Sequence, residues 1–181
     1  QRQLKMADML VETQPAAAMG YRLRRHALWG AIQAVPLTTQ GLRTSLAAMP
    51  CDLVADYRAA LVRPDRALWV QIERSLVLAP SWFEGHLFSA QVAEKLGYAE
   101  VARAIAEELT SFLNRLPRLR DLTFSDGSPF LSAACQQWLA ASDLSAADGE
   151  TSFASMLSTC CQTQGVTAAL QRLDEYLLQQ Q

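Results

Sequence analysis

The residues that could carry acid–base or metal chemistry are few in this sequence. It has two histidines, His26 and His86, and neither lies in a metal-binding or nucleophile motif. His86 shares one predicted helix face with Phe83 and Ala90, which favours a packed histidine with a backbone or carboxylate partner over a metal ligand. We therefore expect no catalytic residue, no cofactor and no metal site.

Two aspartates, Asp121 and Asp126, are the candidates for a pair of acid–base carboxylates, because one loop can bring both together. The residues after Asp126 are Gly-Ser-Pro, which is typical of a turn where the carboxylate accepts local backbone N–H groups. A small hydrolase that uses His86 or Asp126 stays open as an alternative, and a turn is the favoured interpretation.

The four cysteines do not match a metal motif, since no C-x-x-C spacing occurs. Cys160 and Cys161 are adjacent, and neighbouring cysteines rarely form a mutual disulfide because their Cβ atoms point apart. With Cys51 and Cys135 they suggest reduced thiols that act as small apolar residues. This pattern predicts a cytoplasmic location.

Composition indicates a folded domain. The chain has 181 residues, of which 50% are hydrophobic and 19% are charged, so it can bury one substantial core. No stretch supplies the roughly 20 apolar residues of a spanning helix, and we expect no direct membrane insertion. The sequence begins at Gln1 without a signal-peptide pattern, and we expect a fragment of a longer protein.

Charge is unevenly distributed along the chain, although the net charge is only −2. Residues 1–120 hold 15 basic and 11 acidic side chains, whereas residues 121–181 hold one basic and seven acidic. This asymmetry fits head-to-tail contact between copies, and it equally fits ordinary solvated faces. The basic residues form no stripe with interleaved aromatics, so nucleic-acid binding is not expected.

Apolar residues recur at helical spacing along most of the chain, and strand-like alternation is almost absent. We therefore predict an all-α protein of about seven to nine helices. The four tryptophans fall within these helices on or near their apolar sides, which predicts core packing. The predicted helices cover residues 15–35, 52–62, 66–78, 82–96, 99–113, 129–141, 151–163 and 166–178.

Proline, serine and glycine suggest where these helices begin and end. Pro80 should end helix 66–78, and Ser81 should cap the helix after it. Gly97 should stop that helix in a left-handed conformation. Ser128 followed by Pro129 predicts the start of helix 129–141, since proline suits the first helical position.

The loops divide the chain into predicted parts. Residues 35–50 should be a loop, the likeliest internal hinge, with at most a short helical turn around 42–48. We predict a linker or helical extension at 1–14, a helical domain at 15–141 and a C-terminal helical pair at 142–181. This pair is a candidate oligomerisation element.

The last predicted helix has a regular apolar seam, in which four residues are separated by four, three and four positions. Such a seam suits packing against a partner helix. Packing onto its own domain is the other interpretation, because two heptads are too few for a coiled coil. The candidate self-association face consists of Val166, Leu170, Leu173 and Leu177.

An ordered set of short motifs runs along the chain: APSWFEGHLFSA at 79–90, LG at 96–97, FLNRLPRL at 112–119, LTFSDGSPF at 122–130 and WL at 138–139. Together they resemble the C-terminal region of the TssA (VasJ/ImpA-related) family of type VI secretion. Arg25, Trp29, Ile32, Pro36, Gly41 and Thr44 fit the earlier part. The segment after Leu139 does not align, so its interpretation depends on periodicity alone.

The resemblance implies a cytoplasmic, non-catalytic assembly component. Such a protein contacts the tail tube, sheath and baseplate proteins of a contractile injection machine and coordinates their polymerisation. It also implies a homo-oligomeric ring, a hexamer or a dodecamer. The positions that look like scaffold residues are Trp82, Gly85, Pro117, Phe124, Asp126, Gly127, Pro129 and Phe130.

Two other non-enzymatic functions stay open as hypotheses. A tetratricopeptide-like adaptor would bind peptide segments in a concave groove, but no 34-residue repeat is visible. A related sheath-arresting protein would share the domain and act at the opposite pole of the cell. Oligomeric state separates a ring from an adaptor, since an adaptor can stay monomeric.

Overall fold

The computed structural model describes residues 2–143, and it confirms the all-α class for them, apart from a two-stranded sheet. The chain divides into two compact units, Gln1–Leu139 and Ala140–Gln181. The first contains α1 (Arg2–Thr13), α2 (Ala18–Trp29), β1 (Thr38–Gln40), β2 (Arg43–Thr44), α3 (Cys51–Ala60), α4 (Arg66–Leu78), α5 (Phe83–Lys95), α6 (Ala99–Arg115) and the 3₁₀ helix η1 (Pro117–Arg120). A further helical segment begins at residue 133 and is described to residue 143.

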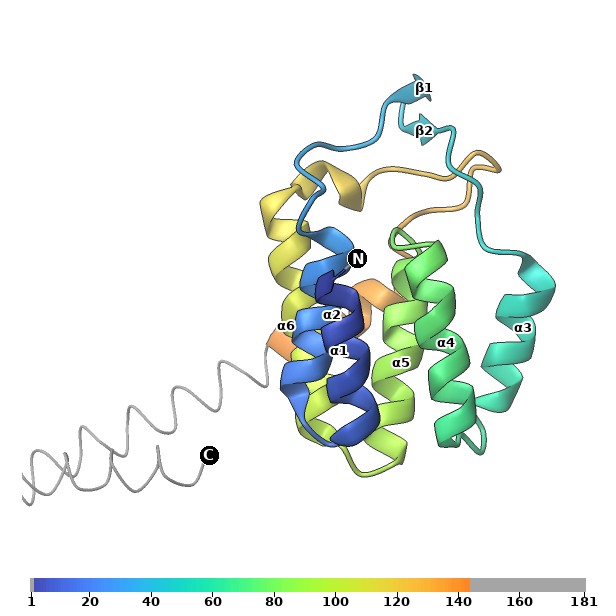
Figure 1. Cartoon of the computed structure of the whole chain (residues 1–181). Helices are drawn as coiled ribbons and strands as arrows, with labels where there is room; N and C mark the ends of the chain where they lie inside the picture. Colours follow the sequence, from blue (N-terminus) through green and yellow to red (C-terminus); the bar gives the residue numbers. More distant parts are fainter. Residues whose placement is uncertain (1, 144–181) are drawn as a thin grey trace, which may run out of the picture. The chain divides into compact units, whose positions relative to one another are not determined.

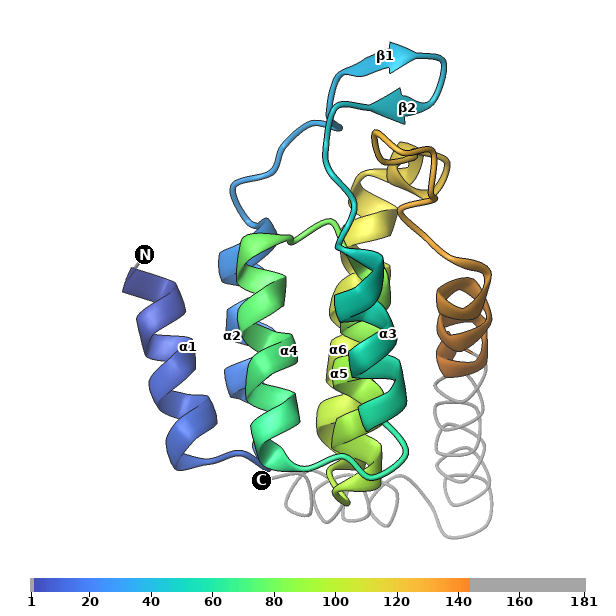
Figure 2. The same ribbon diagram turned by 90° about the vertical axis from the view of Figure 1, so that its right-hand side faces the viewer.

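The helices of the first unit pack side by side with their axes roughly aligned (Figures 1 and 2). Helix α2 contacts α1 and α6, α5 contacts α6 and α4, and α3 lies along α4. No helix in residues 2–143 is long and apolar enough to cross a membrane.

Helices α4 to α6 follow the predicted pattern closely. Helix α4 has the predicted bounds, and Asp65 caps it by accepting the Leu68 backbone N–H at 2.8 Å. Gly97 ends α5 with a φ of +88°, and the Tyr98 N–H donates to the Ala93 carbonyl, as in a Schellman motif. Ser81 does not cap α5, because the N-cap position is Trp82 and has no side-chain hydrogen bond.

The predicted helix 15–35 is too long at both ends. Pro15 lies in the turn between α1 and α2, and α2 ends at Trp29. Arg115 donates to the Trp29 carbonyl at 2.9 Å, which satisfies a terminal carbonyl group of α2. Helix α1 precedes the turn at Pro15 and packs on α2.

The predicted start of helix 129–141 is wrong, because the helical segment begins at residue 133. Residues 122–124 and 128–130 instead run antiparallel, with Phe124 N–H donating to Ser128 and Phe130 N–H donating to Leu122. The hydroxyl of Ser132 accepts the Cys135 N–H at 3.3 Å, so Ser132 replaces Ser128 as the helix-start residue.

The loop predicted at residues 35–50 contains the hairpin β1–β2 and no helical turn. Gly41, with a φ of +61°, lies at its tip. The hairpin is held by a distant loop, because the Thr44 N–H donates to Thr123 and the Ser125 N–H donates to Leu46. Helical periodicity has no means of indicating such a nonlocal pairing.

Two clusters of buried apolar side chains fill the first unit. The first cluster lies around α4, α5 and the aromatic residues Tyr21, Trp69 and Trp82. The second cluster joins α5 and α6 to residues 119–139 and includes Trp29, Phe112 and Phe130. Trp29, Trp69 and Trp82 are buried, as predicted, and Trp138 is partly buried.

Candidate functional site

A buried ion pair joins α2 to α4. The guanidinium of Arg25 makes two hydrogen bonds to the carboxylate of Glu73, at 2.9 and 2.6 Å. Arg25 is completely buried and Glu73 is 3% exposed. Such a two-pronged contact is the strongest geometry for an arginine–carboxylate pair.

Helix α5 contributes a hydroxyl to the same pair. The Ser89 hydroxyl donates to Glu73 and accepts a hydrogen bond from Trp69 Nε1 at 2.8 Å. The Trp69 ring stacks on Tyr21, with ring centroids 4.8 Å apart and an angle of 11° between the planes. Three helices therefore meet at Glu73 through polar contacts enclosed by aromatic rings.

Arg24 extends this cluster toward α1. Its Nη1 donates to Asp8 at 2.6 Å, and its Nε lies 3.1 Å from Glu73 Oε2 as an ion pair without hydrogen-bond alignment. Burial would raise the pKa of Glu73, but Arg25, Arg24 and the Ser89 hydroxyl outweigh burial and lower it. Glu73 is therefore held as a carboxylate inside the protein.

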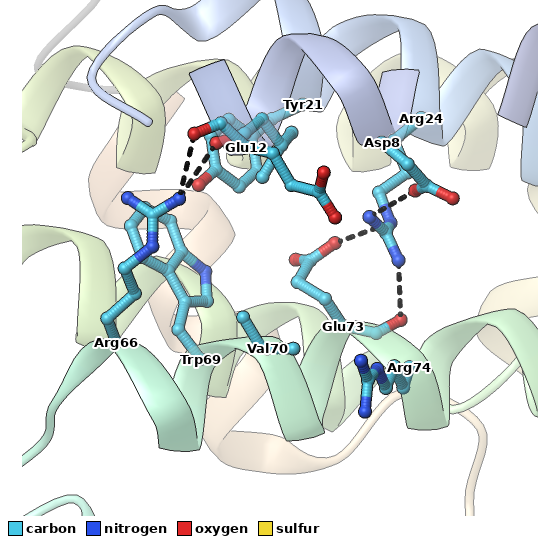
Figure 3. A pocket seen from close by; sticks show the side chains of 10 residues that line it. Asp8, Glu12, Tyr21, Arg24, Arg66, Trp69, Val70, Glu73 and Arg74 are labelled. Carbon is cyan, nitrogen blue, oxygen red and sulfur yellow. Dashed lines mark hydrogen bonds and ion pairs between the residues drawn. The ribbon is translucent and has the colours of Figure 1, made fainter. Parts of the chain in front are cut away.

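A groove of about 160 Å³ opens above this cluster, between α1 and α4 and over α2 (Figure 3). Tyr21 and Trp69 form its floor, and Val11 and Val70 give it apolar walls. Val70 is 38% exposed, although it is a large apolar residue. The groove therefore offers apolar surface to the solvent.

The two rims of the groove carry opposite charges, as Figure 3 shows. Asp8 and Glu12 lie four residues apart on α1, while Arg66 and Arg74 lie on either side of Val70 on α4. Arg66 donates to the backbone carbonyls of Val11 and Glu12 and so holds the end of α1. Such a groove suits an apolar segment with charged residues on both flanks.

His86 is a second buried polar group, and it has no role in the groove. It is completely buried, its ring centroid lies 4.6 Å from that of Trp29, and neither ring nitrogen has a hydrogen-bond partner among residues 2–143. The expected packed position is found, and the backbone group that acts on the ring is the Pro80 carbonyl, although no hydrogen bond of full geometry forms. Burial lowers the pKa of His86 well below its usual value, Arg25 lowers it further, and the Pro80 carbonyl offsets part of this.

The predicted turn at Asp126 is present. Its Oδ1 accepts the Ser128 backbone N–H at 2.9 Å and the Ser128 hydroxyl at 2.6 Å, and Gly127 has a φ of +88°. These hydrogen bonds from Ser128 lower the pKa of Asp126, and Arg43 lowers it slightly further. Asp126 is thus engaged in local bonds, and Asp121 contributes nothing to them.

The eight scaffold candidates fall into three groups: two at the start of α5, one at the start of η1 and five in the loop before the last described helical segment. Trp82 covers Gly85, where an added Cβ would lie 2.3 Å from the Trp82 ring, so only glycine fits. Pro117 begins η1. Phe130 lies 4.4 Å from Phe124 and 6.2 Å from Phe83 by ring centroids. Phe124, Asp126, Gly127, Pro129 and Phe130 share the loop before the last described helical segment.

The ionic cluster was not predicted from the sequence, although a signal for it exists. Glu73 falls within the apolar stripe of Trp69, Ile72 and Leu76, where a lone acid has to find a buried partner. Arg25 likewise lies on the same helix face as Tyr21 and Trp29. A charged residue on each of two apolar stripes predicts a buried ion pair.

Several predictions lie outside the described residues. These are the C-terminal helical pair beyond residue 143, the seam Val166, Leu170, Leu173 and Leu177, and Cys160 and Cys161. Cys51 is exposed and Cys135 is buried, and both are free thiols. Burial raises the pKa of Cys135 to about 12, so this thiol stays protonated.

Among residues 2–143, no three His, Cys, Asp or Glu side chains lie close enough to hold a metal ion. No curated protein matches the chain. A family model described as type VI secretion, EvfE, EvfF, ImpA, BimE, VC_A0119, VasJ matches residues 1–181. The chain therefore belongs to the ImpA/VasJ family of type VI secretion proteins.

Proposed function

We propose that this chain is a non-catalytic assembly domain of the type VI secretion machine that works in the cytoplasm by self-association. Copies would form a hexameric or dodecameric ring at the baseplate and the distal tail end. There the ring would coordinate polymerisation of the tail tube and sheath. A head-to-tail contact repeated about an axis closes into such a ring.

The observation that carries this proposal is the groove between α1 and α4. It combines accessible apolar side chains at Val11 and Val70 with opposite charges on its two rims, a composition that suits a protein partner. Other large apolar residues on α1 are exposed as well, since Met6 is 60% and Met9 is 66% exposed. The family places the chain among secretion components, and this surface supports a protein partner for it.

The test is the absolute mass of the purified chain by light scattering, at two concentrations and two salt levels. A stable mass of six or twelve copies is the expected result. A mass of 19.9 kDa, that of one chain, at every concentration would contradict self-association and favour the peptide-binding adaptor. The sheath-arresting alternative predicts an oligomer too, and fluorescence microscopy of the labelled protein distinguishes it by its position at the opposite pole.

A further inference from the structure

We propose that the groove between α1 and α4 binds residues 166–178 of a second copy of this chain. This inference rests on the proposed function, because it names the contact through which the copies join. Residues 166–178 lie outside the part of the chain that the structure describes. Their sequence identifies them as the occupant.

The apolar surfaces of the two partners match. Tyr21 and Trp69 are stacked and almost completely buried beneath the groove, so the apolar surface open to a partner is at Val70, which is 38% exposed, and at the partly buried Val11. Its volume of about 160 Å³ suits one or two side chains of a helix and not the whole helix. Residues 166, 170, 173 and 177 are Val, Leu, Leu and Leu, which would form one apolar stripe on the helix predicted at 166–178.

The charges of the two partners also match. On a helix of 3.6 residues per turn, the four stripe residues fall within an arc of about 60°. Asp174 then lies about 70° to one side of the stripe, and Arg172 lies about 130° to the other side. When this predicted helix lies along the groove in one of its two directions, Asp174 would lie on the side of the basic rim on α4. Arg172, more than 90° from the stripe, would reach the acidic rim on α1 only through its long side chain.

Each rim has a charged side chain that is available for this contact. Asp8 already pairs with Arg24, and Arg66 already binds carbonyl groups of α1. By contrast, the side chains of Arg74 and Glu12 make no ion pair with any residue in the range 2–143. Arg74 is therefore the partner of Asp174, and Glu12 is the partner of Arg172.

A contact of this kind joins two different surfaces, so it does not close into a symmetric dimer. Every copy offers one groove and one stripe, and each bound copy leaves another groove and another stripe free. Such a contact adds copies head to tail until a ring closes. The excess of basic residues in 1–120 and of acidic residues in 121–181 favours the same order.

The test is a charge exchange in the full chain, followed by light scattering and sedimentation over a range of concentrations. Arg74→Glu and Asp174→Arg should each raise the concentration at which half of the chain is assembled by about tenfold or more, because each brings like charges together. The double variant Arg74→Glu with Asp174→Arg should return this concentration to within about threefold of the original value. Val70→Asp should also prevent assembly, since it places a charge in the groove.

Arg118→Glu is the matched control, because Arg118 is exposed on η1, outside the groove, and undergoes the same change of charge. It should leave the assembly unchanged, and all variants should keep the circular dichroism melting curve of the original chain. An oligomer that tolerates Arg74→Glu, or a double variant that is not restored, would overturn this inference and leave the proposed function standing. A chain that is monomeric at every concentration would overturn both.

Discussion

Glu73 and His86 are both buried, but Glu73 is held in its charged form and His86 in its neutral form. Glu73 lies beside the first apolar cluster with Arg25, Arg24 and Ser89 as partners, and these keep it charged. His86 contacts Trp29 of the second cluster without a hydrogen-bond partner in residues 2–143, and burial keeps it neutral. The partners that reach a side chain therefore decide its charge, since both side chains are equally removed from water.

Because of this contrast, Glu73 and His86 affect the free energy of unfolding in two different ranges of pH. The folded state holds Glu73 with a lowered pKa, so its contribution is present above the usual carboxyl pKa and is lost as the pH falls through the folded pKa. His86 has a lowered pKa as well, but it is the neutral form that is favoured. The effect of His86 on stability therefore begins at a higher pH than that of Glu73, because the unfolded chain takes up a proton near the usual histidine pKa.

The largest expected effect comes from removing the carboxylate of Glu73. Glu73→Ala leaves Arg25 and Arg24 buried without their acid, which should lower the free energy of unfolding by about 3–5 kcal/mol. Chemical denaturation followed by circular dichroism measures this loss. A loss below about 1 kcal/mol would mean that the ion pair contributes little and that water replaces the carboxylate.

The control for Glu73→Ala removes both charges of the pair. Arg25→Met combined with Glu73→Leu replaces the pair by apolar side chains and should recover most of the lost stability, because no unpaired charge from the pair remains. Arg24 keeps Asp8 as its partner in this variant. If the double variant is as unstable as Glu73→Ala, the cost comes from packing and not from charge.

A smaller effect is expected from His86 as the pH falls. Below a pH of about 6.5 the unfolded chain binds a proton that the folded chain excludes from His86, so stability should fall by up to about 1.4 kcal/mol per pH unit. Unfolding free energies measured between pH 7.5 and about 5 test this, because Glu73 does not titrate in that range.

His86→Leu is the matched variant for this measurement, since it keeps an apolar side chain of similar size beside Trp29. It should remove most of the fall in stability below a pH of about 6.5. His26→Leu, which changes an exposed histidine, should leave the fall in place. A His86→Leu chain with the original pH dependence would show that His86 takes up a proton as readily in the folded chain as in the unfolded one.

The smallest expected effect concerns Asp126, whose partners are local and exposed to solvent. Asp126→Ala removes the two hydrogen bonds from Ser128 and should lower the melting temperature by a few degrees at most, far less than Glu73→Ala. Asp126→Asn keeps an acceptor oxygen, so it should retain most of the stability that Asp126→Ala loses. A large loss with both variants would point to a contact of Asp126 that Ser128 does not account for.

Helix positions were the most predictable feature, because each depends on neighbouring residues. The stripe of α6, the bounds of α4 and the left-handed stop at Gly97 all follow from spacing within about 15 residues. The turn at Asp126 and Gly127 follows for the same reason. Local chemistry thus accounts for most of the helical body.

The wrong predictions depend on contacts between distant segments. The hairpin β1–β2 forms against Thr123, and the residues after Ser128 pair back with Leu122 before any helix begins. The ionic cluster joins residues that are 48 positions apart. Its two apolar stripes indicated that buried charges exist, but their pairing depends on how α2 and α4 pack.

The same separation has a consequence for synthesis on the ribosome. Helices α1 and α2 emerge with Arg24 and Arg25 long before Glu73, and 48 residues separate Arg25 from its acid. At roughly 5–20 residues per second, α2 waits about 2–10 s for its partner. During that interval Arg25 has no buried acid to bind and stays hydrated, so the first two helices cannot pack in their final form until α4 has left the exit tunnel.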